Sequence, residues 1–363
     1  MKKITISLLA LTLAVFLAVP VMADVTPYGS IRIGTFWGVD DNKTGTADDE
    51  DLAMPLGNYS RFGAKFKTGD ISGHVELGLK GAEDGDNVYQ RLLYGVWDFG
   101  GGTLLVGQDY CPYTFISAQV APGFYDLENY FIGYGCLWNS RQPQIKLKMA
   151  NGLYAALIRP STTSPTGAAA AADTDVILPK LCVGYEYKAE GLMLNPGFAY
   201  NDYILDDATA GITQRRRVES YLLYLNLKAA LGAVDLKGSI HYGQNLGTFG
   251  ITGRSASANA YVNTADNDIE DSDGLGGYLQ ASMKLDPATV TVGCGYVSDK
   301  NKEASATSNG ADEQLSYFIN AKLPVADTFF VVPELSYYDG MKDADGNDEA
   351  DRWELGLLWQ MDF

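Results

Sequence analysis

The sequence predicts an all-β protein: a transmembrane antiparallel up-and-down β-barrel of 16 strands around a water-filled lumen. Three observations carry this prediction. Apolar and polar residues alternate with a two-residue period in segments of about 8 to 12 residues, the length that a tilted strand needs to cross a bilayer. The connections between these segments alternate between short turns and long polar loops. No run of about 18 apolar residues, as a membrane helix would need, follows residue 23.

The first residues are typical of an export signal. Lys2 and Lys3 precede an apolar run that ends in the small-x-small sequence before Asp24. We therefore expect residues 1–23 to be a cleaved signal peptide and residues 24–363 to form the barrel.

Strand-like segments follow one another along residues 24–363. Most are bounded by Gly, Asn, Asp or Pro, which favour turns. The expected strands are 28–37, 58–67, 71–80, 88–99, 103–110, 144–149, 153–159, 176–188, 192–202, 219–229, 233–243, 277–285, 288–298, 315–323, 328–338 and 352–363.

The connections alternate between short and long, which requires an even number of antiparallel strands with both ends of the chain on the short-turn side. A soluble β-sandwich has no need for such regular lengths. The barrel layout places the turns in the periplasm and the loops outside. The long loops lie near 38–57, 81–87, 111–140, 160–175, 203–217, 244–274, 299–314 and 339–351.

Prolines conflict with a continuous closed sheet, because a proline has no N–H to donate. Pro179, Pro196 and Pro333 lie within expected strands. We expect β-bulges there, or strand boundaries that differ from the pattern.

The alternation also assigns side chains to faces. Lipid offers no hydrogen bonds, so the apolar parity must point outward and the polar parity inward. Outward aromatics such as Tyr278 and Trp353 are expected near the outer ends of strands, and Trp359 and Phe363 near the inner ends. Charged residues such as Arg32, Lys146 and Lys148 then face the lumen, which only a water-filled channel tolerates.

Charge and cysteine content exclude some classes of site. The net charge of −18 disfavours nucleic-acid binding. The acids gather in the expected loops and would attract cations to the entrance of the channel. The lysines and arginines expected to face the lumen would favour anions instead, so the net charge does not predict the selectivity. Asp343, Asp345 and Asn347 partly resemble a calcium loop, which makes loop-bound Ca²⁺ or Mg²⁺ a weak alternative to a solvated loop. Cys111 and Cys136 bracket one loop, and the sequence leaves open whether they are bridged.

Several motifs resemble those of the Gram-negative general porins: YGSIRIG from Tyr28, SRFGAKF around Arg61, RLLYGVWDFGGGTLLVGQD, and an alternating terminal strand that ends in Phe363. The resemblance implies an outer-membrane porin, a homotrimer in which each barrel lets ions and small hydrophilic solutes diffuse passively, with no cofactor. It also implies contacts with outer-membrane lipid and lipopolysaccharide. In that family the terminal strand, here with Trp359 and Phe363, is read by the barrel-assembly machinery.

The resemblance further implies that the third long loop, residues 111–140, folds into the lumen and sets a constriction. Its acids would be Asp126 and Glu128, with Tyr130 among its aromatics, although the loop motif PEFGGD of the family is missing. The facing basic wall would be Arg61, Lys65 and Arg91, and further lumen-lining cations would be Arg32, Lys146 and Lys148.

Three other functions compete with general diffusion. A substrate-selective outer-membrane channel would bind one class of solute at the constriction, and a structural or adhesive barrel would have a plugged lumen and use its loops. An enzyme is disfavoured, because the two histidines, His74 and His241, lie on widely separated strands without a nucleophile motif.

Overall fold

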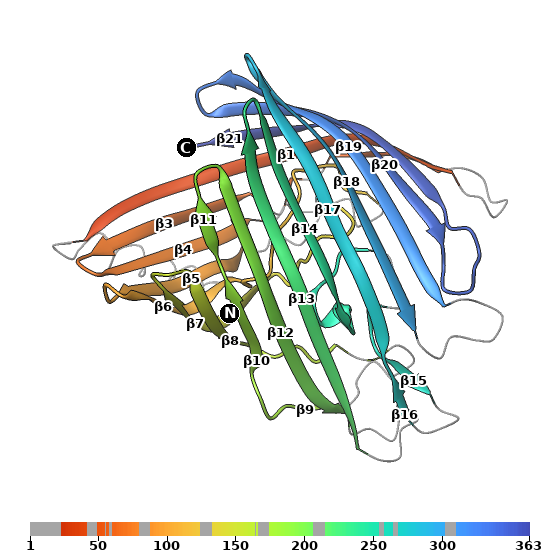
Figure 1. Ribbon diagram of the computed structural model, residues 1–363. Coiled ribbons are helices and arrows are strands. Elements are labelled where there is room, and N and C mark those ends of the chain that lie inside the picture. Colours follow the sequence, from red (N-terminus) through yellow and green to blue (C-terminus); the bar gives the residue numbers. More distant parts are fainter. Residues whose placement is uncertain are drawn as a thin grey trace, which may run out of the picture.

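The computed structural model describes residues 23–41, 49–54, 56–57, 60–79, 88–123, 133–163, 165, 174–205, 215–253, 258–263, 268–301 and 310–363. Most of these residues belong to one antiparallel sheet that curls into a barrel (Figure 1). A short 3₁₀ helix, η3 (Leu246–Phe249), is present. In this part of the chain no helix is both long and apolar enough to span a membrane. The expected signal peptide lies outside the described residues, apart from Ala23.

Each strand of the wall pairs with its neighbours in the chain, and the first strand also pairs with the last. The predicted closed barrel of 16 strands is confirmed, since β2 only extends the outer end of β1 and β9 to β11 share one place in the wall. The strands are β1 (Asp24–Asp41), β2 (Asp49–Ala53), β3 (Arg61–Thr68), β4 (Ile71–Leu79), β5 (Val88–Asp98), β6 (Gly102–Tyr110), β7 (Arg141–Met149), β8 (Leu153–Ile158), β9 (Thr174–Asp175), β10 (Lys180–Tyr185), β11 (Tyr187–Ala189), β12 (Leu192–Leu205), β13 (Arg216–Leu231), β14 (Val234–Gln244), β17 (Ser272–Leu285), β18 (Ala288–Asn301), β19 (Ala311–Ala326), β20 (Phe329–Lys342) and β21 (Asp351–Asp362). Outside the wall, β15 (Tyr261–Asn263) and β16 (Asp268–Glu270) form a separate hairpin.

β1 closes the barrel because it pairs with two different strands along its length. Its first part, residues 24–30, pairs with β3, and residues 30–41 pair with β21. The end of the chain completes this seam, because Phe363 and Gly29 exchange two backbone hydrogen bonds of 2.7 and 3.0 Å. The terminal strand therefore has no free edge.

The alternation of short and long connections is confirmed. Short turns link β3 to β4 and β13 to β14, where Gly69 (φ 54°) and Gly232 (φ 65°) take the left-handed backbone that glycine adopts without steric cost. Short turns occur at every second junction along the wall, so they gather at one end of the barrel.

Side-chain parity agrees with the expected faces in most strands. On β13, Leu223 and Leu225 are exposed on the outer wall, whereas Leu222 and Asn226 are buried inside. Tyr278 is a correction: it is 5% exposed and points inward, because Leu279 takes the outward position. Both residues are apolar, so alternation alone could not decide between them.

The sequence predicted either bulges or different strand boundaries at the prolines. Bulges are wrong at Pro196 and Pro333, where pairing is interrupted without a register shift, and a different boundary is confirmed at Pro179. Pro196 on β12 lies opposite the break between β10 and β11, and the pairing resumes beyond it in the same register. Pro333 lies in a similar gap between β19 and β20. Pro179 precedes β10, so the expected strand began too early. Beside Pro196 and Pro333 the missing N–H is accommodated by leaving two ladder positions unpaired.

Two segments fold into the barrel. One consists of residues 111–123 and 133–140, the described parts of the predicted third long loop. The other is residues 245–253, which follow β14 and had been expected outside. They share an apolar core inside the wall, and its members include Tyr113, Leu137, Leu222, Leu246 and Phe249. One side of the lumen is therefore filled by this core.

Candidate functional site

The outgoing limb of the third loop, residues 111–123, crosses the inside of the barrel against its later strands. The backbone N–H of Ala118 donates to Oε1 of Gln280 on β17 at 2.8 Å. At the end of this described limb, the N–H of Gly123 donates to Oε2 of Glu354 on β21 at 2.7 Å. The limb is held by side chains of the wall along its whole described length.

Glu334 on β20 makes the densest set of these contacts. Its carboxylate accepts the N–H of Ala121 at 2.8 Å and that of Val120 at 2.9 and 3.0 Å. Asn320 and Ser336 each donate to the same carboxylate at 2.8 Å. A buried carboxylate is tolerated because polar groups surround it, and here those groups include the loop backbone.

The return limb, residues 133–140, is held by the second inward segment. Trp138 N–H donates to the carbonyl of Gly250 at 2.6 Å, and Thr252 N–H donates to that of Cys136 at 2.8 Å. Leu137 and Ile251 form an antiparallel bridge between the two segments. The described part of the third loop is thus supported by a second inward segment.

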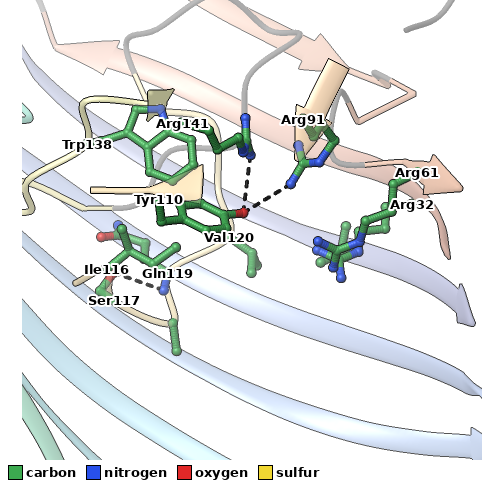
Figure 2. Close-up of a pocket in the computed structure, with 12 residues that line it drawn as sticks. Arg32, Arg61, Arg91, Tyr110, Ile116, Ser117, Gln119, Val120, Trp138 and Arg141 are labelled. Carbon is green, nitrogen blue, oxygen red and sulfur yellow. Dashed lines mark hydrogen bonds between the residues drawn. The ribbon is translucent and has the colours of Figure 1, made fainter. Parts of the chain in front are cut away.

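Opposite the loop, four arginines from separate strands surround one cavity of about 250 Å³. Figure 2 shows their side chains facing the loop segment 116–120 across this cavity. None of the described residues that line it is acidic. The lining residues are Arg32, Arg61, Arg91, Tyr110, Ile116, Ser117, Ala118, Gln119, Val120, Trp138, Arg141 and Leu358.

A β-bulge directs Arg91 into this cavity. Glu76 of β4 pairs with Leu92, and the next residue of β4 pairs with Gln90, so Arg91 is the extra residue of β5. The side-chain amide of Gln108 donates to the carbonyls of Gln90 and Arg91 at 3.2 and 3.1 Å. The polar groups that the bulge frees are therefore partly satisfied.

Glu76 is the carboxylate that neutralises part of this wall. It accepts from Nε of Arg91 at 2.6 Å and lies 3.6 Å from Nη1 of Arg61. The hydroxyl of Tyr28 donates to its other oxygen at 2.6 Å. One carboxylate therefore serves two guanidinium groups.

Arg141 belongs to the wall but was missed by sequence reasoning. Its guanidinium carbon lies 5.0 Å from the ring centre of Tyr110 and 4.9 Å from that of Trp138. Figure 2 shows Arg141 and Arg91 converging on the Tyr110 hydroxyl, with distances of 3.4 and 3.3 Å. Arg141 shares the outward parity of β7, and its place at the start of the strand, after Ser140 (φ 48°), lets it point inward.

The other predicted cations lie away from the cavity. Lys65 lies 5.9 Å from the ring centre of Tyr28. Lys146 lies 3.8 Å from Asp109, and Lys148 lies 2.5 Å from Glu186. They follow the predicted inward parity but do not join the four arginines. The predicted acids Asp126 and Glu128, and Tyr130 with them, lie outside the described residues.

The weak metal site and the cysteine pair gain no support. Asp343 accepts the backbone N–H groups of Asp345 and Asn347 at 2.9 and 2.8 Å, so its carboxylate serves the turn itself. The described residues hold no cluster of ligands suited to a metal. Cys111 and Cys136 are buried free thiols.

The terminal aromatics lie on the outer face, as expected. Trp359 is 39% and Phe363 is 67% exposed, and Trp359 stacks on Phe329 with ring centres 6.4 Å apart. Both lie at the short-turn end of the barrel.

Comparison with known families decides what kind of barrel this is. Residues 10–360 match the model of a family described as Gram-negative porin. The chain belongs to the Gram-negative porins. It is therefore an outer-membrane channel for passive diffusion.

Solved structures of low sequence identity share this fold. The outer membrane channel DcaP of Acinetobacter baumannii has a TM-score of 0.72 at 15% identity, over 94% of this chain and 97% of that one. An anion-selective porin from Comamonas acidovorans has a TM-score of 0.59 at 12% identity, over 94% and 100%. OmpF of Salmonella typhi, in complex with daunomycin, has a TM-score of 0.59 at 14% identity, over 93% and 97%. Comparison with curated proteins gives no match.

Proposed function

We propose that this porin favours small anions over cations at its constriction. The observation that carries the proposal is the lining of the cavity: four arginines surround it, and the described residues that line it include no carboxylate. Arg61 and Arg91 share the single carboxylate of Glu76, which lies behind them in the wall.

The acids on the opposite side of the lumen are already engaged. Glu334 accepts hydrogen bonds from the loop backbone. Glu354 accepts from Gly123 N–H and also from Nε of Arg352 at 2.8 Å. These contacts leave the arginine wall as the main source of charge at the described cavity. Charged rings that line a narrow pore set the sign of the ion that passes.

Salt screens the opposing effect that acidic loop residues have on an anion in the cavity. Exposed charges are largely screened beyond about 8 Å at physiological ionic strength. Two unit charges about 4 Å apart interact by about 1 kcal/mol in water and about 4 kcal/mol at a partly buried surface. A permeating anion close to Arg141 therefore gains more from the wall than it loses to the loops.

Reversal potentials test this proposal. The purified porin is placed in a planar bilayer under a KCl gradient, and we expect the sign of an anion-favouring channel. Arg61→Gln with Arg141→Gln should reduce this preference, whereas Lys322→Gln should leave it unchanged, because Lys322 does not line the cavity. A cation preference in the wild-type porin would refute the proposal.

We propose the same measurement to separate the competing functions. Absence of conductance would favour a structural or adhesive barrel, and saturable block by one solute class would favour a substrate-selective channel. General diffusion predicts a current proportional to salt concentration. The cavity left beside the inward segments supports an open passage.

Assembly and partners complete the proposal. A structure with this fold, OmpT of Vibrio cholerae, carries the description "trimer form", with a TM-score of 0.54. We propose a homotrimer that contacts outer-membrane lipid and lipopolysaccharide and is inserted by the barrel-assembly machinery. An unboiled sample in a detergent gel should migrate as a trimer and shift to the monomer on heating.

The proposal includes no catalytic activity and no cofactor. His74 is engaged by two phenols: the Tyr28 hydroxyl lies 2.6 Å from its Nε2 and the Tyr94 hydroxyl lies 3.1 Å from its Nδ1. His241 is 2% exposed on β14. Neither arrangement presents a base beside a nucleophile, which supports a passive channel.

A further inference from the structure

Lys228 on β13 and Lys237 on β14 lie directly opposite each other across the two strands. Cβ atoms of such a pair are about 5 Å apart, and like charges in this position destabilise a sheet. Both residues are three positions from the turn that joins Leu231 to Val234, so the pair lies at the short-turn end of the lumen. This end faces the periplasm in a porin.

No carboxylate neutralises this pair. Lys237 donates to the backbone carbonyl of Ile116 at 2.6 Å, and Lys228 is exposed. In the described part of the chain neither lysine forms an ion pair. Asp235 shares the inward parity of β14 but is not bound to either of them.

Both ammonium groups lie over the same aromatic ring, that of Phe115. The Nζ atom of Lys237 lies 4.8 Å and that of Lys228 lies 5.5 Å from the ring centre of Phe115. The ring stacks on Tyr278, with centres 6.2 Å apart, and is fixed by it. A ring face stabilises a cation but carries no net charge, so the pair keeps its two positive charges.

We propose that Lys228 and Lys237 hold a small divalent oxyanion, such as sulfate, at the periplasmic mouth of the channel. The proposal rests on the anion preference proposed above, and it adds a second subsite beyond the arginine wall. Two ammonium groups beside one ring supply one positive charge for each negative charge of the ligand. A monovalent anion such as chloride gains only part of this attraction.

Block of the chloride current by sulfate tests the subsite. Sulfate is added to one side of a porin-containing bilayer in KCl, and then to the other. We expect saturable block that is stronger from the short-turn side. Lys228→Gln should raise the half-blocking concentration about tenfold, because a dianion loses one close charge. Lys228→Arg, which keeps the charge, should retain most of the block.

Lys284 provides a matched control. It lies near the same end of the barrel, on β17, but faces Thr289 rather than a second lysine. Lys284→Gln should therefore leave the block unchanged. Equal loss of block in Lys284→Gln and Lys228→Gln would overturn the proposal, because the effect would then be general to the mouth.

A second variant separates ligand binding from loop support, since Phe115 and Ile116 belong to the third loop. Phe115→Leu keeps both lysines and should retain sulfate block. Loss of block in Phe115→Leu, with block intact in Lys228→Gln, would overturn the proposal and make the lysines supports of the loop. A wild-type porin with anion-favouring reversal potentials but no sulfate block would overturn this subsite alone, whereas cation-favouring potentials would overturn the proposed function.

Discussion

The Nε atom of Arg91 donates to Oε1 of Glu76 at 2.6 Å, and both side chains are buried in the wall of the barrel. A bulge in β5 makes this contact, because it turns Arg91 inward beside the strand that carries Glu76. The same carboxylate that stabilises the bulged strand also sets how much positive charge the lumen wall retains.

Glu76→Gln should strengthen the anion preference and weaken the barrel. Removing the carboxylate leaves Arg61 and Arg91 without their shared counter-charge, and breaking a buried pair costs about 3 kcal/mol. We expect a reversal potential shifted further toward that of chloride, together with a lower unfolding temperature in detergent. An unchanged reversal potential would show that Glu76 does not control the wall charge.

Glu334→Gln should loosen the third loop without changing the charge at the arginine wall. The glutamine amide has one acceptor oxygen where the carboxylate has two, so the N–H groups of Val120 and Ala121 lose partners. Each lost hydrogen bond to a charged group costs about 2 kcal/mol. We expect larger open-channel current noise in single-channel recordings.

Glu313→Gln is the control for that variant. Glu313 lies on the neighbouring strand β19 and accepts from the Tyr296 hydroxyl at 2.5 Å, away from the loop. It should leave the current noise unchanged. If both variants are equally noisy, the noise arises in the wall and not in the loop.

The sequence was sufficient for the barrel because one physical rule acts at every strand. Lipid outside and water inside impose an alternation that repeats along the whole chain. The rule fails where both neighbours are apolar, as at Tyr278 and Leu279, and where a strand begins, as at Arg141. Alternation ends at such positions, and the local backbone decides the direction of the side chain.

The constriction was only partly predictable, for a different reason. Arg61 follows from strand parity. Arg91 was also predicted to face inward, but the bulge in β5 sets its direction. The partners of the third loop lie far away in the chain. Glu334 is more than 200 residues from Ala121. No local pattern marks such a contact, and the inward course of residues 245–253 left no signal in a loop of mixed composition.

Acidification should open the turn at residues 343–347, which lies in the long connection between β20 and β21. Burial raises the pKa of Asp343 slightly, but hydrogen bonds from Asn347, Asp345 and Gly346 outweigh it and lower the pKa below the usual value. The carboxylate therefore stabilises the turn above the pKa of the unfolded loop, and this stability is lost as the pH falls through the lower, folded value.

NMR titration of the Asp343 carboxyl carbon in detergent should show this lowered pKa. Asp348 serves as the comparison. Its carboxylate forms an exposed ion pair with Lys342 at 3.8 Å. Added Ca²⁺ should leave the Asp343 signal in place, since the turn occupies its oxygens. A shift of the Asp343 carboxyl signal on addition of Ca²⁺ would instead support calcium binding at this turn.

Phe363 tests whether the end of the chain acts in assembly. Its backbone closes the seam with Gly29, and its ring lies against Gly29 so closely that a Cβ there would meet it at 2.4 Å. Phe363→Ala keeps the backbone bonds and removes the ring, whereas deletion of Phe363 removes both. We expect both variants to reduce the heat-modifiable, membrane-inserted fraction, with the larger loss on deletion.

Phe99→Ala, which removes an aromatic from a short turn, is the control. Molecules that do insert should show the wild-type reversal potential, because the arginine wall is unchanged, and normal insertion of the deletion variant would contradict an assembly role for Phe363.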